Sequence, residues 1–352
     1  MSSDVPVLET NYIIDCDFAR FKVKKLLGQG GFGSVYLVEE CVSHKKYAVK
    51  TEIIPGPNDT FQPLLPWEET ILLAIQELPK ENYKKHFVKI ADRGIIPPLR
   101  FMIMTLVGKS LYDIKDLRPL QCFTENTCWR IAIQTLEAFE AFQEAGFVHR
   151  DIKPQNYTIG SSGQEDVIFM LDFGLVRCYT GKKYPTAGED KPNFAGTVRY
   201  CSRSSHYNVY QFPKDDLESW VLSLLELHDN EAIFWRCIDK RSEVGIMKND
   251  LFLGQEPSKI FNYYVPPLYK KLVKAVGDLT PANNMTSPTP AMQKKVNLVP
   301  IYDILNEIGK TYKYSNSKVF DWQKTDSSID DNYGIAGKYK HKSSKKKKKK
   351  WF

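Results

Sequence analysis

Residues 149–156 read His-Arg-Asp-Ile-Lys-Pro-Gln-Asn, and residues 172–174 read Asp-Phe-Gly. At this spacing, Asp151 can accept the proton of an attacking hydroxyl, while Asn156 and Asp172 supply oxygen ligands for Mg²⁺ against nucleotide phosphates. Either motif alone matches many unrelated proteins by chance, but both in this order rarely do. The sequence therefore predicts a phosphoryl-transfer site.

The segment between the two motifs is predicted to be a β-hairpin. Residues 157–159 read as a short strand, residues 160–163 as a turn, and residues 167–171 as a buried strand. Because a hairpin brings its two open ends together, Asn156 and Asp172 would lie side by side and could share a metal. The alternative is a surface hairpin that carries these polar residues by accident.

A glycine-rich loop lies upstream, where Gly28, Gly30 and Gly33 fit the pattern G-x-G-x-x-G. The pattern alone is weak, because dinucleotide-binding folds share it and place it before a helix. Here residues 34–39 and 46–50 follow, both rich in β-branched and aromatic residues. The loop is therefore predicted to join two strands and to approach phosphates through its backbone.

Lys50 closes the second of these strands and is the candidate for binding the α- and β-phosphates. Such a lysine needs an acidic partner to hold it extended. Residues 66–75 are predicted to be a helix, with Pro66 tolerated in its first turn. Glu68 is the preferred partner, because the apolar residues after it can then pack inward, but Glu69 stays an alternative. Both acids could instead only face the helix dipole.

Three further segments are typical of one enzyme family. Residues 196–202 read Gly-Thr-Val-Arg-Tyr-Cys-Ser, residues 215–220 read Asp-Asp-Leu-Glu-Ser-Trp, and residues 319–322 read Val-Phe-Asp-Trp. With the motifs above, the chain resembles the casein-kinase-1 superfamily of protein kinases, nearest its tau-tubulin-kinase-like branch. The resemblance covers roughly residues 18–322.

The resemblance implies an α+β, two-lobed protein-kinase fold that binds ATP and Mg²⁺ between its lobes. The small lobe, an antiparallel sheet plus one helix, would end near residue 104. A hinge would cover residues 105–108, and a mainly helical large lobe residues 109–322. Residues 1–17 would be an N-terminal extension and residues 323–352 a disordered, lysine-rich tail.

The resemblance also assigns the nucleotide site. Met104 would be the gatekeeper, and Asp113 would approach the ribose, although it could equally be the N-terminal acid of a helix that starts near Ser110. The residues expected to bind the nucleotide and its metal are Leu27, Gly28, Gly30, Gly33, Val35, Ala48, Lys50, Met104, Leu106, Val107, Asp113, Asn156 and Asp172.

Lys153 and Thr197 indicate the substrate class. Lys153, two residues after Asp151, would lie between the attacking hydroxyl and the γ-phosphate and offset the negative charge there. A lysine at this position resembles the serine/threonine-kinase pattern, and Thr197 would bond toward both residues and fix them for a short hydroxyl nucleophile. The expected substrates are protein serine and threonine residues, without excluding dual specificity. The expected catalytic set is Asp151, Lys153, Lys50, Glu68 and Thr197.

Arg150, Arg177 and Arg199 match positions that converge on an anion pocket in many members of this family. Guanidinium groups suit phosphate because their donors match its oxygens in pairs. The resemblance therefore implies a preference for acidic or already phosphorylated substrates. The alternative is structural, with Arg150 only bracing the activation segment.

The helices of the large lobe can be read from the residues themselves. Thr124 is a plausible N-cap of a helix that ends just before Gly146. Residues 217–227 are apolar nearly all round, which predicts a helix buried within the lobe. By resemblance, Asp216 at its start would bond back to the catalytic loop.

Composition predicts a soluble, cytoplasmic or nuclear enzyme. There is no cleavable signal and no apolar run long enough to span a bilayer. The seven cysteines are scattered, which is typical of free thiols in a reducing compartment, and no spacing suggests a metal other than magnesium. We expect a monomer.

The positive net charge belongs to the tail. Nine of the 49 basic residues lie between Lys338 and Lys350, where no acid occurs, and the other 40 face 42 acidic residues. This tail could bind an import receptor, bind anionic lipid, or be solvated without a partner. Specific nucleic-acid binding is not expected.

Two function classes remain open at this point. One is an active kinase, and the other is a pseudokinase-type scaffold that binds partners through the fold and the tail. Pseudokinases usually lose the phosphate-binding lysine, the catalytic aspartate or the metal aspartate. Because Lys50, Asp151 and Asp172 are all present, the sequence favours activity.

Overall fold

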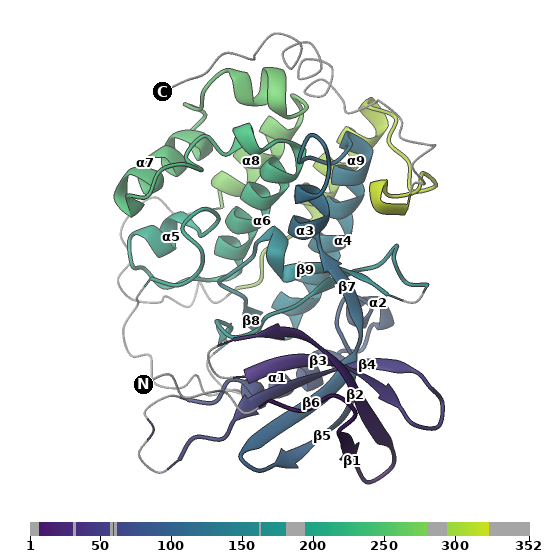
Figure 1. The fold of residues 1–352 in the computed structure, drawn as a ribbon. Helices are drawn as coiled ribbons and strands as arrows, with labels where there is room; N and C mark the ends of the chain where they lie inside the picture. Colours follow the sequence, from purple (N-terminus) through teal and green to yellow (C-terminus); the bar gives the residue numbers. More distant parts are fainter. Residues whose placement is uncertain are drawn as a thin grey trace, which may run out of the picture. The chain divides into compact units, whose positions relative to one another are not determined.

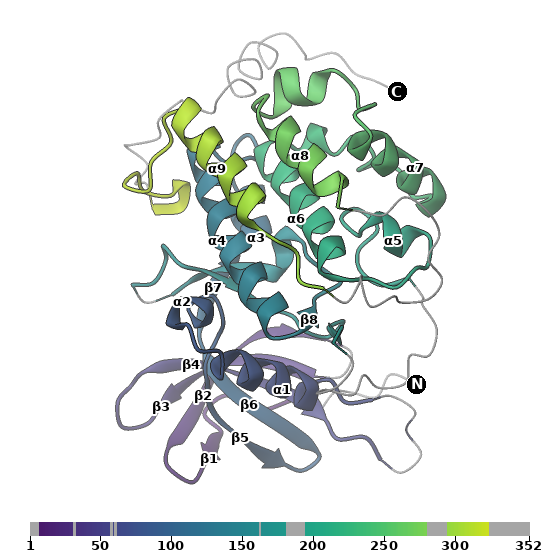
Figure 2. The same ribbon diagram turned by 180° about the vertical axis from the view of Figure 1, so that it is seen from behind.

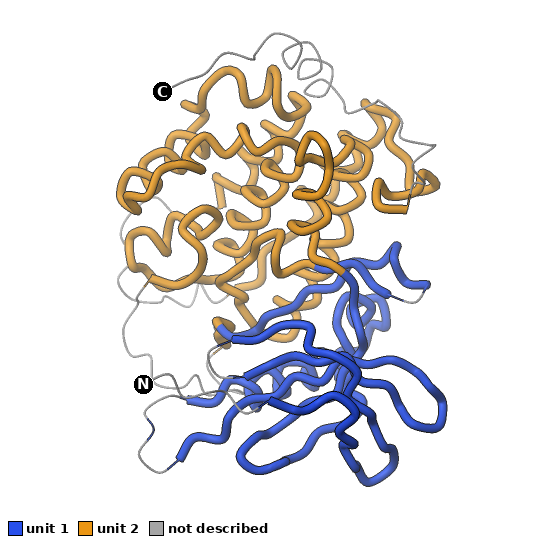
Figure 3. Tube along the Cα trace, in the orientation of Figure 1, with its two compact units in different colours: residues 1–108, 158–174 blue, residues 109–157, 175–352 orange. Residues whose placement is uncertain are grey.

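The computed structural model describes residues 7–30, 33–56, 59, 62–161, 163–180, 194–279 and 294–323. The chain forms two compact units, which Figure 3 colours separately. The first comprises residues 1–108 and 158–174, and the second residues 109–157 and 175–352. The predicted lysine-rich tail lies outside the described residues, apart from residue 323.

The first unit is built on a six-stranded antiparallel sheet in the order β1-β2-β3-β4-β6-β5 (Figure 1). Burial alternates along β3, so every second side chain faces the core. The strands predicted at residues 34–39 and 46–50 are confirmed. The strands are β1 Ile13–Asp15, β2 Arg20–Gln29, β3 Gly33–Glu40, β4 Lys46–Ile53, β5 Ile90–Ile96 and β6 Leu99–Thr105.

Helix α1, Leu65–Gln76, packs against this sheet, and the one-turn helix α2, Glu81–Lys84, follows it (Figure 2). Pro66 lies in the first turn of α1, where its missing N–H leaves no hydrogen bond unmade. The predicted helix and the predicted combination of an antiparallel sheet with one main helix are confirmed.

The core of the first unit begins earlier in the chain than predicted. Leu8 and Ile14 are 8% and 1% exposed and belong to the same hydrophobic cluster as Phe21. Ile14 pairs with Phe21 between β1 and β2, and the backbone N–H of Leu8 donates to the Tyr36 hydroxyl at 3.1 Å. Part of the predicted N-terminal extension, residues 1–17, therefore supplies core side chains and an edge strand.

The predicted hairpin is present. Strand β9, Tyr157–Gly160, lies between β10, Ile168–Met170, and β7, Val107–Ser110, in a three-stranded sheet. Its second strand is shorter than the predicted residues 167–171. Residues 158–174 belong to the first unit, so this unit is made of two stretches of sequence. The prediction instead ended the small lobe near residue 104.

The second unit is mainly helical, as predicted. Helix α6 is buried along its whole length and packs against α4 and α8. A two-stranded sheet joins β8, Phe147–Val148, to β11, Arg177–Cys178. The helices are α3 Leu111–Asp116, α4 Glu125–Glu144, α5 Arg203–His206, α6 Pro213–His228, α7 Arg241–Phe252, α8 Tyr269–Gly277 and α9 Val299–Thr311, with short helices η1 Pro154–Asn156, η2 Asn230–Ala232, η3 Ile260–Tyr264 and η4 Asp321–Gln323.

Helix α4 begins and ends where the sequence indicates. The Thr124 side chain accepts a hydrogen bond from the Thr127 N–H, and Gly146 follows the helix with a φ of +89°. Asp321, from the Val-Phe-Asp-Trp segment, accepts hydrogen bonds from the Thr124 N–H at 2.7 Å and from its hydroxyl at 2.9 Å. This segment therefore anchors the start of α4.

Within the described residues, no helix combines the length and the apolar character needed to cross a membrane.

We predict that Ile14→Ala destabilises the first unit by about 2–4 kcal/mol, because it leaves a cavity in a fully packed core. Phe18→Ala is the control, since Phe18 is 97% exposed and its loss should change the free energy of unfolding by less than about 0.5 kcal/mol. Urea and thermal unfolding measure both. Equal effects of the two changes would contradict the assignment of Ile14 to the core.

Candidate active site

The predicted ion pair of Lys50 is formed with Glu68. The Lys50 ammonium donates to both carboxylate oxygens, at 2.5 and 2.6 Å. The neighbouring Glu69 pairs instead with Arg93, which separates the two alternatives. Burial raises the pKa of Glu68, and the positive charge of Lys50 opposes this shift.

Glu52, which the sequence analysis did not single out, holds the start of α1, the helix that carries Glu68. The Glu52 carboxylate, in β4, accepts hydrogen bonds from the backbone N–H groups of Leu64 at 2.6 Å and Leu65 at 3.1 Å. Negative charge is favourable at this end of a helix, where N–H groups lack partners. Glu52 thus ties the start of α1 to the strand that carries Lys50. In the sequence, the one indication of this role was that Glu52 is an acid just after the strand that Lys50 was predicted to close.

The three predicted loop glycines differ in their surroundings. A Cβ on Gly33 would lie 1.9 Å from the Thr51 carbonyl oxygen, so close packing against β4 excludes any side chain there. A Cβ on Gly28 would meet nothing within 4 Å, and one on Gly30 would have only a contact at 3.8 Å. Among the described residues, Gly28 and Gly30 therefore border open space. Residues 31 and 32 lie outside the described part of the chain.

Most of the predicted nucleotide residues of the sheet share one face. Val35 lies opposite Lys50 on the neighbouring strands, and Ala48 lies opposite Met104. Cross-strand partners point to the same side of a sheet, and residues two apart do so as well. The side chains of Val35, Ala48 and Met104 therefore share one face of the sheet with Lys50. Leu27, in β2, is 46% exposed.

The predicted hinge and ribose residues have identified contacts. The Leu106 carbonyl accepts a hydrogen bond from the Ser161 hydroxyl at 2.7 Å, and Val107 begins β7. Ser110 caps α3: its hydroxyl accepts from the Asp113 N–H at 3.1 Å and donates to the Asp113 carboxylate at 2.7 Å. This capping role matches the alternative reading of Asp113 as an N-terminal helix acid.

In the second unit, Asp151, Lys153 and Thr197 lie together. The Thr197 hydroxyl donates to one oxygen of Asp151 at 2.8 Å, and the Lys153 ammonium donates to the other at 2.6 Å. Lys153 also donates to Thr197 at 3.1 Å. The Asp151 carboxylate is therefore held in one orientation from both sides.

The two predicted metal ligands belong to different units. The side-chain NH₂ of Asn156 donates to the Asp151 backbone carbonyl at 2.9 Å, so the amide nitrogen faces the catalytic loop and the oxygen is the group left for a cation. Asp172, in the first unit, has a φ of +63°, an uncommon conformation for a residue with a side chain. Such backbone strain is often found at functional sites.

Asp216 holds the catalytic loop, as the resemblance implied. Its carboxylate accepts hydrogen bonds from the backbone N–H groups of His149 at 2.6 Å and Arg150 at 2.8 Å. Arg150 has a φ of +66°, which these two bonds stabilise. Burial raises the pKa of Asp216 to about 7, and the two N–H donors act against that shift.

Gly196 explains how Thr197 comes so close to the loop. A Cβ at Gly196 would lie 2.5 Å from the Arg150 carbonyl oxygen, and its φ is +100°. Both the space and the backbone conformation require glycine here. The Gly-Thr pair thus brings the Thr197 hydroxyl to the Asp151 carboxylate.

The three predicted anion-binding arginines make different contacts. The Arg150 Nε donates to a backbone carbonyl just after the Asp-Phe-Gly motif at 2.7 Å. The Arg177 guanidinium lies 4.6 Å from the centre of the Tyr210 ring. Arg199 pairs with the buried carboxylate of Glu226 at 3.1 Å. One Arg199 donor is thus engaged with α6.

Lys248 was not found by the sequence reading, because a lysine in a helix resembles a surface residue. Its side chain is fully buried, and its ammonium donates to the backbone carbonyls of Val198 at 2.7 Å and Cys201 at 2.6 Å. Trp235 donates to the carbonyl of Arg199 at 3.0 Å. Burial lowers the pKa of Lys248 to about 8. Together these side chains fix the segment that follows Thr197.

Comparison with known proteins agrees with this geometry. The protein kinase domain family matches residues 21–294. Relatives in Caenorhabditis elegans include the putative serine/threonine-protein kinase ZK507.1, 32% identical over 65% of this chain and 67% of its own length. The putative serine/threonine-protein kinase ZK507.3 is 31% identical over 76% of this chain and 68% of its own length. The putative casein kinase I C03C10.2 is 30% identical over 65% and 66%.

Family match, fold and catalytic-loop geometry lead to one conclusion: the chain belongs to the protein kinase family, within the group of relatives named as serine/threonine-protein kinases.

Proposed function

We propose that the protein transfers the γ-phosphoryl group of ATP to serine and threonine hydroxyls of proteins. The observation that carries this proposal is the Asp151 carboxylate, held by Thr197 at 2.8 Å and by Lys153 at 2.6 Å. A carboxylate fixed beside a lysine can receive a proton from an incoming hydroxyl while the lysine offsets the phosphate charge. No step requires a covalent enzyme intermediate.

Asp151 acts as the proton acceptor in the proposed reaction. As the hydroxyl oxygen bonds to the γ-phosphorus, its proton passes to Asp151, and the bond from that phosphorus to the oxygen of ADP breaks. Lys153 stabilises the charge on the transferred group. Thr197 keeps the Asp151 carboxylate turned toward the substrate. Little of the free energy of substrate binding is therefore needed to orient this carboxylate.

The nucleotide would be held by the first unit through Lys50, the glycine loop and the sheet face that carries Val35, Ala48 and Met104. The open space at Gly28 fits the approach of phosphates. Oxygen ligands suit Mg²⁺, which takes few protein ligands and shares the rest with phosphates and water. Asn156 and Asp172 would hold that ion, which neutralises charge on the β- and γ-phosphates.

We further propose that the chain belongs to the casein-kinase-1 superfamily. The segments at residues 196–202, 215–220 and 319–322 support this, and so does the relative named as a putative casein kinase I. The tau-tubulin-kinase-like branch rests on the sequence motifs alone.

A preference for phosphorylated substrates would depend on Arg177 rather than on Arg199. Arg177 pairs with Val148 across the two-stranded sheet, so it lies next to the start of the catalytic loop. Arg199 is tied to Glu226, and its loss would leave a buried carboxylate with one donor fewer. The two residues can therefore be separated by experiment.

We predict that Asp151→Asn lowers kcat by about 10²–10⁴-fold, the usual contribution of a general base. Transfer of labelled γ-phosphate to casein and to an acidic serine peptide measures it. Asp303→Asn, at an exposed position of α9, is the control and should keep wild-type turnover. Nucleotide binding without turnover in either wild type or variant would instead indicate a scaffold.

The ion pair gives a second prediction. Glu68→Gln should lower kcat/KM for ATP by about 10²-fold, because a misplaced Lys50 no longer orients the phosphates. Glu69→Gln should change it by less than about twofold, since its pair with Arg93 is partly exposed. If both variants lost the same activity, the role given to Glu68 would have to be abandoned.

A further prediction concerns substrate preference. Arg177→Gln should reduce the ratio of kcat/KM for phosphorylated over unphosphorylated peptide by about tenfold or more, because a charged hydrogen bond contributes about 1.5–3 kcal/mol. Arg199→Gln should lower Tm and leave this ratio unchanged. Steady-state kinetics with a matched peptide pair decide the matter, and an unaltered ratio in Arg177→Gln rules out its contact with phosphate.

A further inference from the structure

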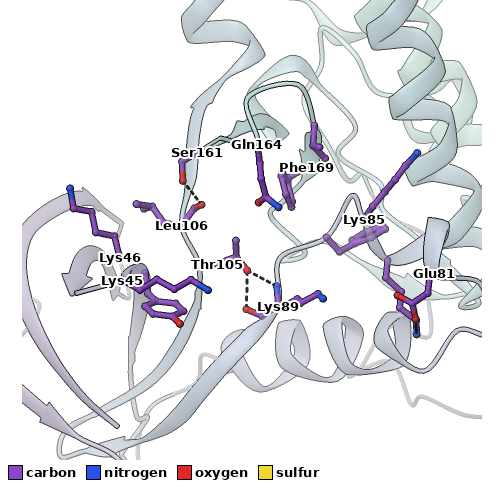
Figure 4. Close-up of a pocket in the computed structure, with 14 residues that line it drawn as sticks. Lys45, Lys46, Glu81, Lys85, Lys89, Thr105, Leu106, Ser161, Gln164 and Phe169 are labelled. Atoms are coloured by element: carbon purple, nitrogen blue, oxygen red, sulfur yellow. Dashed lines mark hydrogen bonds and ion pairs between the residues drawn. The ribbon is translucent and has the colours of Figure 1, made fainter. Parts of the chain in front are cut away.

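The first unit contains a cavity of about 620 Å³, in the size range of ligand sites (Figure 4). Its walls come from the turn between β3 and β4, from α2 and the segment after it, from the end of β6, and from the hairpin between β9 and β10. Of the predicted nucleotide and catalytic residues, only Leu106 contributes to its lining.

Positive charge gathers around this cavity. Five lysines line it, and the one acidic lining residue, Glu81, pairs with one of them at 2.7 Å. The lining thus comprises five lysines and one acid, and the acids Glu165 and Asp166 adjoin it in the hairpin turn. The five residues are Lys45, Lys46, Lys84, Lys85 and Lys89. We call this site the lysine-rimmed pocket.

The lysines surround an apolar centre. Phe87 and Phe169 are 1% and 5% exposed and line the pocket together with Leu106 and Val167. Figure 4 shows Lys45 and Lys46 on one side and Lys85 on the other, with Leu106 and Phe169 between them. A ligand that fits both features carries several negative charges and at least one apolar group.

The walls of the pocket are fixed by hydrogen bonds. The Ser161 hydroxyl donates to the Leu106 carbonyl at 2.7 Å and ties the hairpin to the end of β6. The Thr105 hydroxyl accepts from the Lys89 N–H at 3.0 Å and ties in the segment after α2. The site is thus formed before a ligand enters, which lowers the entropic cost of binding.

The arrangement of the lysines indicates the class of ligand. Arginine forks bind a single phosphate in pairs, whereas lysine ammonium groups act as separate point charges. Here they come from two stretches of the chain, residues 45–46 and 84–89, so they match charges spaced along an extended chain better than one compact anion. A flat lipid surface could reach the rim but not the recessed apolar side chains of Leu106 and Val167.

We propose that the lysine-rimmed pocket docks an acidic segment of a protein substrate. Carboxylates or phosphoserines of that segment would bind the lysines, and an apolar side chain would pack on Leu106 and Val167, which are only partly buried. The Gln164 amide, which also lines the pocket, can bond the peptide backbone. This inference rests on the proposed kinase function, since it assigns the site to a substrate.

Binding of a labelled peptide, measured by fluorescence anisotropy, tests the proposal without turnover. The probe alternates glutamate with leucine and phenylalanine, and its two controls replace either the glutamates by glutamine or the apolar residues by serine. We expect Lys46→Glu/Lys89→Glu to weaken binding about tenfold or more, because the charge reversals act at the site itself. Both control peptides should bind the wild type more weakly.

The matched control protein is Lys310→Glu/Lys318→Glu, which changes the net charge equally at exposed positions of the second unit. It should bind the acidic peptide like the wild type. Equal weakening by both double variants would show only nonspecific attraction and overturn the proposal. So would equal binding of the glutamine peptide, or binding to phosphatidylserine vesicles with the same dependence on Lys46 and Lys89.

Failure of this inference can be told apart from failure of the kinase assignment. Asp151→Asn should bind the acidic peptide like the wild type, although it lacks turnover. When the acidic segment is fused to a short acceptor peptide, Lys46→Glu/Lys89→Glu should raise KM and leave kcat unchanged. With the short acceptor alone, neither constant should change. If the docking inference is wrong but the kinase assignment is right, the wild type still phosphorylates the short acceptor peptide.

Discussion

The catalytic loop depends on one buried carboxylate. Asp216, in the first turn of a helix that is buried from end to end, accepts the backbone N–H groups of both His149 and Arg150. These bonds hold the left-handed conformation of Arg150, and its carbonyl lies so close to Gly196 that only glycine fits. Because burial raises the pKa of Asp216 from 3.8 to about 7, the native state binds more protons than the unfolded state between these values. Its contribution to stability therefore falls as the pH rises through that range, which is the cost of placing Asp151 accurately.

In the first unit, buried acids also hold the functional residues in place, but they act through a helix and an ion pair. Glu52 and Glu68 are buried acids that each have a defined partner: one binds the N–H groups at the start of α1, and the other binds Lys50. The helix and the strand are thus joined at two places. A lysine on a long, flexible side chain gains a single direction only when such a partner holds it, and its rotamer entropy is then lost before the nucleotide binds.

The sequence predicted the parts of this structure that depend on local patterns. Strand β3 alternates in burial, α1 carries proline in its first turn, and the hairpin turn is rich in glycine and serine. The prediction failed where a contact joins residues far apart in the chain. Leu8 reaches Tyr36, Glu52 caps a helix 12 residues away, and Lys248 bonds carbonyls almost 50 residues earlier. Nothing in the local composition around Lys248 distinguishes it from a solvated lysine, because only the fold supplies its burial and its acceptors.

The distribution of charge shows why a net value says little about recognition. Outside the terminal lysine cluster the chain carries 40 basic and 42 acidic residues, yet five lysines and one acid line a single cavity of the first unit. Exposed charges act over about 10 Å at 0.1 M salt, so a ligand at this cavity experiences the local excess and not the overall balance. Lysines spread over two stretches of the chain favour a ligand whose charges are also spread, and the partly buried Leu106 and Val167 between them add a requirement that simple polyanions do not meet. Charge would then set the rate of encounter, while the apolar contact would determine which acidic chains stay bound.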